Sequence, residues 1–517
     1  MSNPRLQKTL MFLLISVLLA VVFFHLVRDI RDNDFFWHLK TGQWTWEHRE
    51  IPLKDPFSFT TVGFESVRER FIMSSYWLSQ VIFSLFYSAA GMPGIVLLRF
   101  IVVGSLLFIM IRRREGDSVI YTALLLLFLG LMLKSYPIER PQVISFVFFA
   151  LLLYLLSGRK ESDGSDHAEN GYGRSLYISV PLLMLVWANM HGGYVAGAAT
   201  IALYIACEGL KFAHPSLAPM GKADYKILLV AGVLGLVSCL VNPNTYHVFS
   251  AEIVFQQDYL TFNNIEYQST ARIFRRFHDY SIIVYWLVLS LTVAGLLINI
   301  RKIDITEAAL LALLGYFSFT SVRYIAFFMI AALPPVGRIF SDNRLLKPFR
   351  AFILAASLAF ALLLTQDNLT FETLSSGRWI DKQKFPVEAA DFILANDLKG
   401  NMYNYFNWGG YLIWRLAPER KVFIDGRTLY SHIYLQSDLI DNADKRSFDG
   451  RPAWKAAFDD YNIQYTITPV SLPLVKALSE DNDWTPVFWR HNSIIFVRNT
   501  PENRNVIQSF SVDKGYF

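Results

Sequence analysis

Long apolar runs alternate with short polar segments over the first two thirds of the chain. The runs are about 16 to 21 residues long and recur from residue 9 to residue 366. Each is long enough to cross the hydrocarbon core of a bilayer as a helix. The pattern predicts a polytopic α-helical membrane protein with about eleven spans, at 9–27, 93–111, 118–133, 142–157, 176–190, 193–213, 225–241, 281–299, 306–321, 322–339 and 350–366.

Residues 76–90, "YWLSQVIFSLFYSAA", are the ambiguous segment, because the run is short and a "GMPG" turn follows it. If this segment does not cross, the short loops rich in Lys and Arg all fall on one side, which the positive-inside rule makes the cytoplasm. The first run lacks a small-residue cleavage site and is expected to be an uncleaved anchor with a cytoplasmic N-terminus. Further crossing segments would give 12 or 13 spans.

The composition changes after residue 366, where apolar runs shorten and charges return. Short strand-like and helix-like segments then alternate, which predicts a C-terminal extracytoplasmic α/β domain with a partly parallel sheet. Expected strands include "NMYNYFN", "KVFIDGR", "QYTITPV" and "WRHNSIIFVR". The predicted organisation is a transmembrane module over 1–366, with a first outer loop at 28–75, and a second domain over 367–517.

Composition supports a membrane protein and narrows its partners. The chain is 53% hydrophobic and only 18% charged, whereas soluble domains carry about 25% charged residues. The net charge of +5 reflects cytoplasmic loops, so no nucleic-acid partner is inferred from it. The chain lacks the glycine motifs of nucleotide sites, and its two cysteines form neither a disulfide framework nor a zinc pattern.

The opening of the first outer loop carries the first candidate for chemistry. Asp32 and Asp34 follow the first span and precede "FFWHLKTGQWTW". One interpretation is that Asp34 caps a short interfacial helix. The other is a general base, since a carboxylate beside aromatic rings is partly desolvated and has a raised proton affinity.

Two arginines at predicted outer ends of spans are candidate phosphate ligands. Arg140 lies in "YPIERPQ" between two prolines, and a guanidinium binds phosphate oxygens in a bidentate manner. The alternative for Arg140 is a lipid head group or a pair with Glu139. Arg323, beside Tyr324, stands at a junction of two spans, where an arginine is costly unless it is paired or faces a cavity.

Other outer-face residues are candidates for binding a hydroxylated substrate. Asn189 and His191 lie at a span end in "WANMHGG", and Glu266 lies in the long loop 242–280. The alternatives are a satisfied polar histidine, a tight glycine turn, and a loop whose arginines contact lipid head groups. Loops of that length are usually functional or disordered.

These features resemble the GT-C superfamily of polytopic glycosyltransferases, which use lipid-phosphate-linked sugars. The resemblance covers the layout of the whole chain: one span, an outer loop opening with an acidic residue, many further spans and a C-terminal extracytoplasmic α/β domain. The segments "DNDFFWHLKTG", "ERPQ", "WANMHGG", "VRYIAFFMIAALPP" and "WGGYLIW…KVFIDGR" are similar to an uncharacterised bacterial group placed beside that superfamily. "WGGYLIW" is weakly similar to the Trp-Trp-Asp-Tyr-Gly region of oligosaccharyltransferases but lacks its Asp, which argues against recognition of a peptide sequon.

The resemblance implies a glycosyltransferase of the bacterial cytoplasmic (inner) membrane. Asp34, with Asp32 as second choice, would accept the proton of an acceptor hydroxyl, and Arg140 or Arg323 would stabilise a polyprenyl-phosphate leaving group. The implied partners are a polyprenyl-phosphate sugar donor, membrane lipids and an acceptor protein, lipid or glycan. A divalent metal serves some members, but no convincing ligand set is present. Candidates on the acceptor side are Trp408, Tyr411, Asp425 and Arg427.

Three alternatives stay open. Asp425 and Arg427 fit a plain turn in which the two side chains bracket each other. The whole chain fits a transporter of lipid-linked glycans, although the centres of its spans carry few polar residues. It also fits a non-catalytic scaffold for envelope assembly, with the C-terminal domain as its binding module.

Overall fold

The computed structural model forms two compact units, and each unit draws on separate stretches of the chain. Unit 1 consists of Met1–Arg28, Ala89–Val248 and Thr261–Gly377, and unit 2 consists of Asp29–Ser88, Phe249–Leu260 and Arg378–Phe517. The first outer loop thus shares a unit with the C-terminal part, a division that differs from the predicted boundary at 366/367. The residues described are 16, 20, 22–64, 66–116, 118–157, 173–217, 219–247, 264–298, 303–341, 350–365, 377, 379–446 and 450–516.

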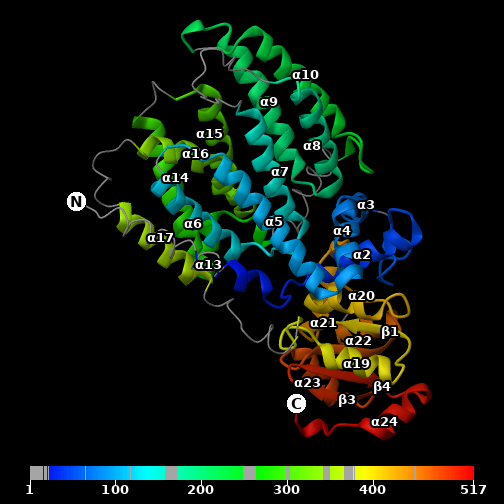
Figure 1. The fold of residues 1–517 in the computed structure, drawn as a ribbon. Helices are drawn as coiled ribbons and strands as arrows, with labels where there is room; N and C mark the ends of the chain where they lie inside the picture. The colour runs from blue at the N-terminus through cyan, green and yellow to red at the C-terminus, as the bar shows by residue number, and fades with distance from the viewer. Residues whose placement is uncertain are drawn as a thin grey trace. The chain divides into compact units, whose positions relative to one another are not determined.

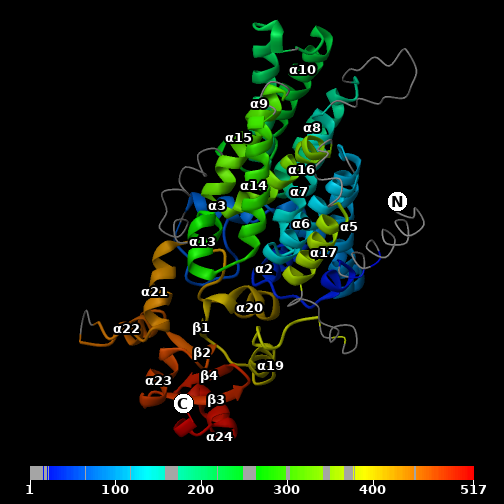
Figure 2. The ribbon, with the colours of Figure 1, turned by 90° about the vertical axis from the view of Figure 1, so that its left-hand side faces the viewer.

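Unit 1 is a bundle of apolar helices that lie side by side (Figures 1 and 2). Packing pairs include α6 with α17, α8 with α10, and α5 with α7. The helices are α5 (Met92–Arg112), α6 (Ser118–Ser135), α7 (Pro141–Leu156), α8 (Leu176–Met190), α9 (Tyr194–Lys211), η1 (Pro215–Leu217), α10 (Lys222–Ser238), η2 (Ile265–Tyr267), α13 (Thr270–Phe277), α14 (Ser281–Ile298), α15 (Ile305–Thr320), η3 (Val322–Tyr324), α16 (Ile325–Ser341) and α17 (Arg350–Thr365).

Three helical segments of the described chain are long and apolar enough to cross a membrane: Met92–Arg112, Ser281–Ile298 and Val322–Phe340. Shorter apolar helices occupy most of the other predicted spans, so the count of about eleven remains a prediction. The helix in the ambiguous segment, α4 (Trp77–Ala90), has 14 residues. At 1.5 Å per residue it is about 21 Å long, less than the roughly 30 Å hydrocarbon core.

Unit 2 joins the first outer loop to a small sheet with helices. Its N-terminal helices are α2 (Phe35–His48) and α3 (Val67–Ser74) of the outer loop, and most of α4, which follows the loop. Its C-terminal elements are α19 (Val387–Ala395), β1 (Asn401–Asn404), η6 (Phe406–Trp408), α20 (Gly409–Leu416), α21 (Ser431–Asp441), α22 (Ala453–Asp460), β2 (Ile463–Pro469), α23 (Pro473–Glu480), β3 (Trp484–Arg490), β4 (Ser493–Arg498), η7 (Pro501–Asn503), α24 (Arg504–Phe510) and η8 (Lys514–Tyr516).

The sheet is mixed, as predicted. Its strand order is β1-β2-β4-β3, with β1 parallel to β2 and β4 antiparallel to both β2 and β3. The core beneath it contains fully buried Tyr403, Phe423, Phe458 and Trp484. Burying each such ring stabilises the fold by about 1.5–3 kcal/mol, so this core fixes the segments around it.

Two of the predicted strands are wrong. "WRHNSIIFVR" is a hairpin, because His491 adopts a positive φ of 51° and reverses the chain between β3 and β4. "KVFIDGR" forms no strand of the sheet. Its Val422 instead makes an isolated parallel bridge with Ser58 of the outer loop, reinforced by hydrogen bonds from Phe59 N to Val422 O (3.2 Å) and from Val422 N to Phe57 O (3.0 Å).

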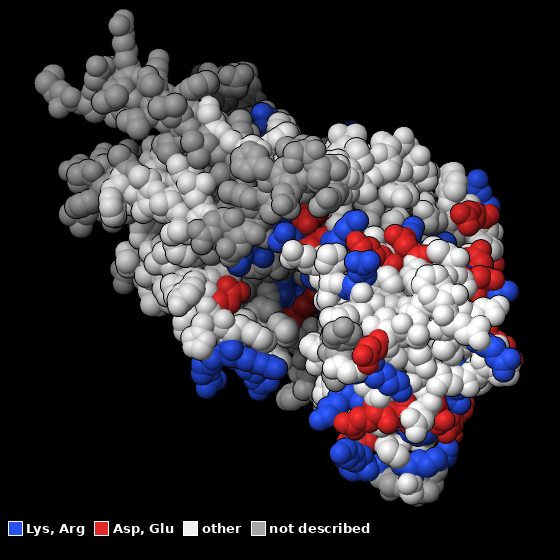
Figure 3. All heavy atoms as spheres, turned by 90° about the horizontal axis from the view of Figure 1, so that it is seen from below, with Lys and Arg blue, Asp and Glu red and all other residues white. Residues whose placement is uncertain are grey.

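Acidic and basic side chains are intermixed on the face drawn in Figure 3. In unit 2, exposed pairs of this kind include Arg446 with Asp444 and Arg451 with Asp459. Such pairs add little stability, but interspersed charges are typical of a surface that faces water. This agrees with the predicted position of the C-terminal part outside the lipid.

Candidate functional site

The two aspartates at the start of α2 have different partners. Asp32 Oδ2 accepts the backbone N–H of Phe35 at 3.1 Å, which satisfies a donor at the helix N-terminus. Asp34 stands at the N-cap position but makes no side-chain capping bond, so the capping interpretation of Asp34 is wrong. Asp34 Oδ1 accepts the indole N–H of Trp37 at 3.2 Å, and the residue is partly exposed.

Gly426 of "KVFIDGR" lies against the carboxylate of Asp34. A Cβ built on Gly426 would stand 2.2 Å from Asp34 Oδ1, and its three nearest neighbouring atoms all belong to the Asp34 carboxylate. Any residue larger than glycine at 426 therefore displaces this carboxylate. The Asp34 carboxylate can hold this position only because residue 426 has no side chain.

Two further glycines hold the third motif, "WGGYLIW", against the other two. A Cβ on Gly409 would stand 2.1 Å from the backbone oxygen of Ile424, and one on Gly410 would stand 2.4 Å from that of Asn33. Both neighbours are main chain, which cannot move aside as a side-chain end can. The N-terminus of α20, the start of α2 and the Ile424–Gly426 segment therefore meet in one junction, which we call the glycine junction.

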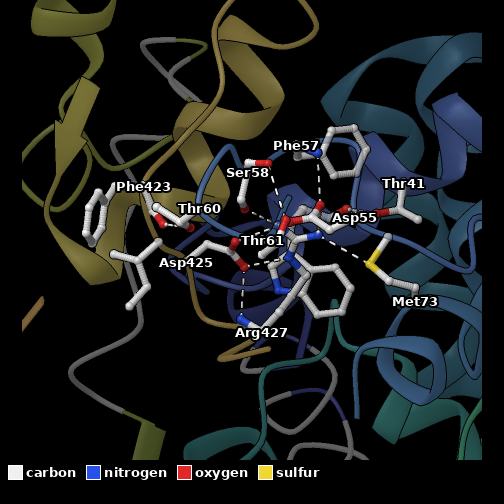
Figure 4. Close-up of polar contacts among 12 residues, drawn as sticks. Thr41, Asp55, Phe57, Ser58, Thr60, Thr61, Met73, Phe423, Asp425 and Arg427 are labelled. Carbon is white, nitrogen blue, oxygen red and sulfur yellow. Dashed lines mark hydrogen bonds and ion pairs between the residues drawn. The ribbon is translucent and has the colours of Figure 1, made fainter. Parts of the chain in front are cut away.

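Arg427 is clamped between two carboxylates beside this junction (Figure 4). Its guanidinium donates to Asp425 Oδ1 and Oδ2 at 2.7 and 2.6 Å and to Asp55 Oδ1 and Oδ2 at 2.7 and 3.1 Å. Ser58 Oγ accepts a further bond at 3.2 Å. The side chains of Arg427 and Asp55 are both 0% exposed. Burial alone would lower the pKa of Arg427, but the two carboxylates outweigh it and raise that pKa.

These contacts favour the turn interpretation of Asp425 and Arg427. Asp425 Oδ1 also accepts the backbone N–H of Arg427 at 2.9 Å, and Asp425 O accepts the N–H of Thr428 at 3.2 Å. Asp425 and Arg427 bracket each other as the sequence suggested, and Asp55 is the partner that sequence reasoning missed. The residue lies 372 positions from Arg427, and no local signal in "PLKDPFSF" points to it.

Trp408 and Tyr411 are core residues of unit 2. Trp408 is buried and donates its indole N–H to Lys384 O at 2.9 Å. Tyr411 is buried and stacks on Phe385 with a centroid distance of 5.4 Å. Burial raises the pKa of the Tyr411 hydroxyl. Neither ring is presented to solvent, which weighs against their predicted contact with an acceptor.

A small pocket with polar and apolar lining residues lies beside the Asp425 turn. Its cavity of about 20 Å³ has room for about one water molecule. Two of its lining side chains are held by hydrogen bonds. The Thr60 hydroxyl donates to Phe423 O at 2.6 Å, and the Tyr430 hydroxyl donates to Glu69 Oε2 at 2.7 Å. The lining residues are Ser58, Thr60, Thr61, Phe423, Ile424, Asp425, Thr428, Leu429, Tyr430 and Ile433.

Arg140 and Glu266, both predicted substrate ligands, form an ion pair within unit 1. Arg140 Nη1 lies 2.9 Å from Glu266 Oε1, with the side chains 23% and 38% exposed. Glu266 O accepts the hydroxyl of Ser321 at 2.9 Å, which fixes the Glu266 segment to the start of η3. Glu139, the alternative partner of Arg140, makes a buried pair with Arg99.

Arg323 lies in the same region of unit 1. It donates to the hydroxyl of Tyr267, which is next to Glu266 in sequence, and its guanidinium stands 5.1 Å from the centre of that ring. The main chains beside these two residues are also hydrogen-bonded. Gln268, next to Tyr267, accepts through its backbone oxygen the N–H of Val322, next to Arg323, at 3.0 Å. Tyr324 packs its ring between Phe317 and Phe327. Unit 1 therefore holds Arg140, Glu266 and Arg323 together through η2 and η3.

His191 is held in a buried network at the end of α8. Its Nδ1 accepts the N–H of Gly193 at 2.9 Å, so the hydroxyl of Ser145, 2.8 Å away, donates to the same nitrogen. Ser145 in turn accepts the indole N–H of Trp187 at 2.8 Å. Asn189 donates to Val241 O at 2.8 Å and ties α8 to the end of α10. The contacts of His191 match the alternative of a satisfied polar histidine.

Among the described residues, no group of three or more His, Cys, Asp or Glu side chains is arranged to hold a metal ion. Asp34 and Asp32 belong to unit 2, whereas Arg140 and Arg323 belong to unit 1. The proximity expected of the aspartate and the arginines therefore stays a prediction, as do their roles.

Known proteins of similar structure exist, although sequence comparison finds none. No family model matches the chain, and no curated protein matches it. The structure of ArnT from Cupriavidus metallidurans in the apo state matches with a TM-score of 0.50 and 12% identity, covering 95% of this chain and 98% of that one. The same protein bound to undecaprenyl phosphate gives 0.50 and 13%, with the same coverage.

A second protein extends the likeness. The Archaeoglobus fulgidus oligosaccharyltransferase, tethered to an acceptor peptide containing the NVT sequon, matches with a TM-score of 0.52 and 12% identity, covering 95% of this chain and 74% of that one. At these identities the likeness establishes the fold, and both proteins are membrane glycosyltransferases of the GT-C superfamily. The chain therefore shares the fold of these two proteins over 95% of its length, and both belong to the superfamily that its sequence resembles.

Proposed function

We propose that the protein is an inverting membrane glycosyltransferase that moves a sugar from a polyprenyl-phosphate donor to an acceptor hydroxyl at the outer face of the bacterial inner membrane. The GT-C fold supports the reaction class. The ArnT structure with undecaprenyl phosphate supports a lipid-phosphate donor. The observation that carries the proposal is Asp34: a partly exposed carboxylate that does not cap its helix and is held by Trp37 and Gly426.

In the proposed reaction Asp34 accepts the proton of the acceptor hydroxyl. The acceptor oxygen forms a bond to the anomeric carbon as the bond from that carbon to the phosphate oxygen breaks. Polyprenyl phosphate leaves with the bonding electrons. General-base assistance of this kind contributes typically 10²- to 10⁴-fold in rate.

Arg140 and Arg323 are proposed to stabilise the charge that develops on the leaving phosphate. A guanidinium placed where charge develops acts on the transition state more than on the bound substrate. Arg140 is 23% exposed and forms an ion pair with Glu266, so a bound phosphate would compete with the Glu266 carboxylate for the Arg140 guanidinium.

Asp34→Asn tests the proposal against a matched change two residues away. The amide keeps the size of the side chain but cannot accept a proton as a base. Release of polyprenyl phosphate is measured on purified protein with a panel of polyprenyl-phosphate sugars and with membrane extract as the acceptor source. We expect Asp34→Asn to lose at least about 10²-fold in kcat with wild-type abundance in the membrane.

Asp32→Asn is the comparison. Its amide oxygen still accepts the Phe35 N–H, so the expected change in kcat is within about threefold. Equal kcat for Asp34→Asn and wild type would overturn the base assignment. Wild-type protein that releases no polyprenyl phosphate, yet moves labelled lipid-linked sugar between vesicle leaflets, would favour the transporter alternative instead.

A further inference from the structure

A buried ion pair joins the end of the first helical segment to the loop that carries Arg140. Arg99 of α5 donates through Nη1 to Leu26 O at 3.0 Å and to Arg28 O at 2.7 Å. Its Nη2 lies 3.2 Å from Glu139 Oε1, and the two side chains are 2% and 1% exposed. One guanidinium therefore fixes both the main chain at 26–28 and the carboxylate next to Arg140.

A contribution to the stability of the fold is a poor explanation for the Arg99–Glu139 pair. Within the described residues, Nε and Nη2 of Arg99 and Oε2 of Glu139 have no hydrogen-bond partner. A buried charge pair stabilises a protein only when its geometry is good and its remaining donors and acceptors are satisfied. Apolar side chains of similar volume often replace such pairs without loss of stability, so we look for a second role of this pair.

What the pair fixes suggests its role. Arg28 is the last residue of unit 1 before the outer loop, and Asp34 follows six residues later. Glu139 directly precedes Arg140, and Pro141 begins α7. The pair thus lies at the start of the segment leading to the proposed base and beside the proposed phosphate ligand.

We propose that Arg99 and Glu139 are positioning residues for sugar transfer: by locking 26–28 to the 139–140 loop, they set where Arg140 stands for the leaving phosphate. This inference rests on the proposed function. A small misplacement of a group that acts in the transition state costs rate even when substrate still binds. Loss of the pair should therefore lower kcat and leave KM for the donor little changed.

The test uses a double change, because removing one partner leaves an uncompensated buried charge. Arg99→Met with Glu139→Leu replaces both charges by apolar groups, and we expect wild-type abundance and an equal or higher Tm. The expected kcat is at least about tenfold lower, with donor KM within about threefold. Arg99→Lys keeps the charge but not the fork that reaches two carbonyls and a carboxylate, so an intermediate kcat is expected.

Arg338→Met is the control. Arg338 pairs with Glu115 and Glu307, a second ion-pair group of unit 1. Its kcat should equal that of the wild type. A loss in Arg338→Met equal to that in the double variant would overturn the inference, since any ion pair of the bundle would then have the same effect.

A thermodynamic cycle separates positioning from mere packing. Arg140→Gln is introduced into the wild type and into the double variant, and the loss of kcat is measured in each. If the pair acts through Arg140, the loss in the double variant should be at least about threefold smaller than the loss in the wild type. An equal cost in both backgrounds, or wild-type kcat in the double variant, would overturn the inference. If wild-type protein shows no transfer with any donor, the proposed function fails. The same cycle is then measured on binding of polyprenyl phosphate, where equal costs would overturn positioning.

Discussion

Asp34 Oδ1 and Gly426 are in such close contact that a Cβ on the glycine would lie 2.2 Å from the oxygen. The two residues are 392 positions apart in the sequence. The bare backbone of a turn in the C-terminal part therefore forms one wall around the carboxylate at the start of the first outer loop. This contact makes the position of Asp34 depend on the size of one side chain.

Gly426→Ala is predicted to slow sugar transfer strongly without unfolding the protein. The atoms nearest to its methyl group are those of the Asp34 carboxylate, a side-chain end that can move, so we expect the carboxylate to rotate away while the turn stays. We expect at least about tenfold lower kcat, because a base must stand within hydrogen-bond reach of its proton, with normal membrane abundance. Gly104→Ala is the control, since nothing lies within 4 Å of a Cβ at 104. Normal kcat in Gly426→Ala would contradict the assignment of Asp34.

Arg427→Met is predicted to destabilise unit 2 strongly. It leaves the carboxylates of Asp55 and Asp425 buried and facing each other, a situation that costs about 3–5 kcal/mol. The measurement is thermal unfolding of the purified full-length protein, together with its abundance in membranes. Adding Asp55→Asn and Asp425→Asn to Arg427→Met should recover part of the lost stability.

A surface pair provides the control for the Arg427 variant. Arg446 pairs with Asp444 but is 74% exposed, and such pairs are worth about 0–1 kcal/mol. Arg446→Met should therefore leave the Tm unchanged. A similar loss of Tm in Arg427→Met and Arg446→Met would contradict the larger contribution to stability predicted for the buried contacts of Arg427.

Asp441 is predicted to make unit 2 less stable as the pH rises from about 4 to about 7. Burial, and to a lesser extent the neighbouring Asp438, raises the pKa of this carboxyl from 3.8 to about 7, although it accepts the Tyr403 hydroxyl at 2.7 Å. Between these values the folded chain keeps a proton that the unfolded chain has released, so stability falls with pH. The slope is at most about 1.4 kcal/mol per pH unit.

Asp441→Asn isolates this effect, since its amide oxygen still accepts the Tyr403 hydroxyl but does not titrate. The difference in Tm between variant and wild type should be small at pH 4 and grow toward pH 7, with the variant more stable. A difference that is constant over this range would contradict the raised pKa.

Trp408→Phe is predicted to affect stability rather than the acceptor. The change removes the hydrogen bond to Lys384 O and leaves that carbonyl without this donor, at a cost of about 1–3 kcal/mol. KM for the acceptor should stay unchanged, because the ring is buried. A rise in acceptor KM at constant Tm would instead restore the acceptor role that the sequence suggested.

The predicted orientation can be tested by labelling cysteines in whole cells. After replacement of Cys207 and Cys239, single cysteines are placed at Arg275, on the predicted outer side, and at Ser157, on the predicted cytoplasmic side; both positions are exposed. A membrane-impermeant maleimide should label position 275 in intact spheroplasts and position 157 only after permeabilisation. The reverse pattern would contradict the positive-inside assignment.

The sequence predicted those features that depend on local pattern. Apolar runs marked the helices of unit 1, since a helix in lipid must be apolar along its whole length. The change of composition after residue 366 indicated the small mixed sheet. The polar residues at the predicted outer ends, among them Arg140 and Glu266, were recognised because an ionisable residue beside a span requires a partner.

Only the tertiary structure decided which residues meet. The sequence around Val422 has the pattern of a strand. In the structure this segment pairs with the outer loop and not with the sheet, because packing and not propensity decides which segment it pairs with. Arg427 and Asp55 form a clamp across 372 positions. Glycine is required at 409 and 410 by the backbone that approaches them, and at 426 by the carboxylate of Asp34. Local sequence carries no record of a distant neighbour, so these contacts, and with them the environment of Asp34, emerge only from the fold.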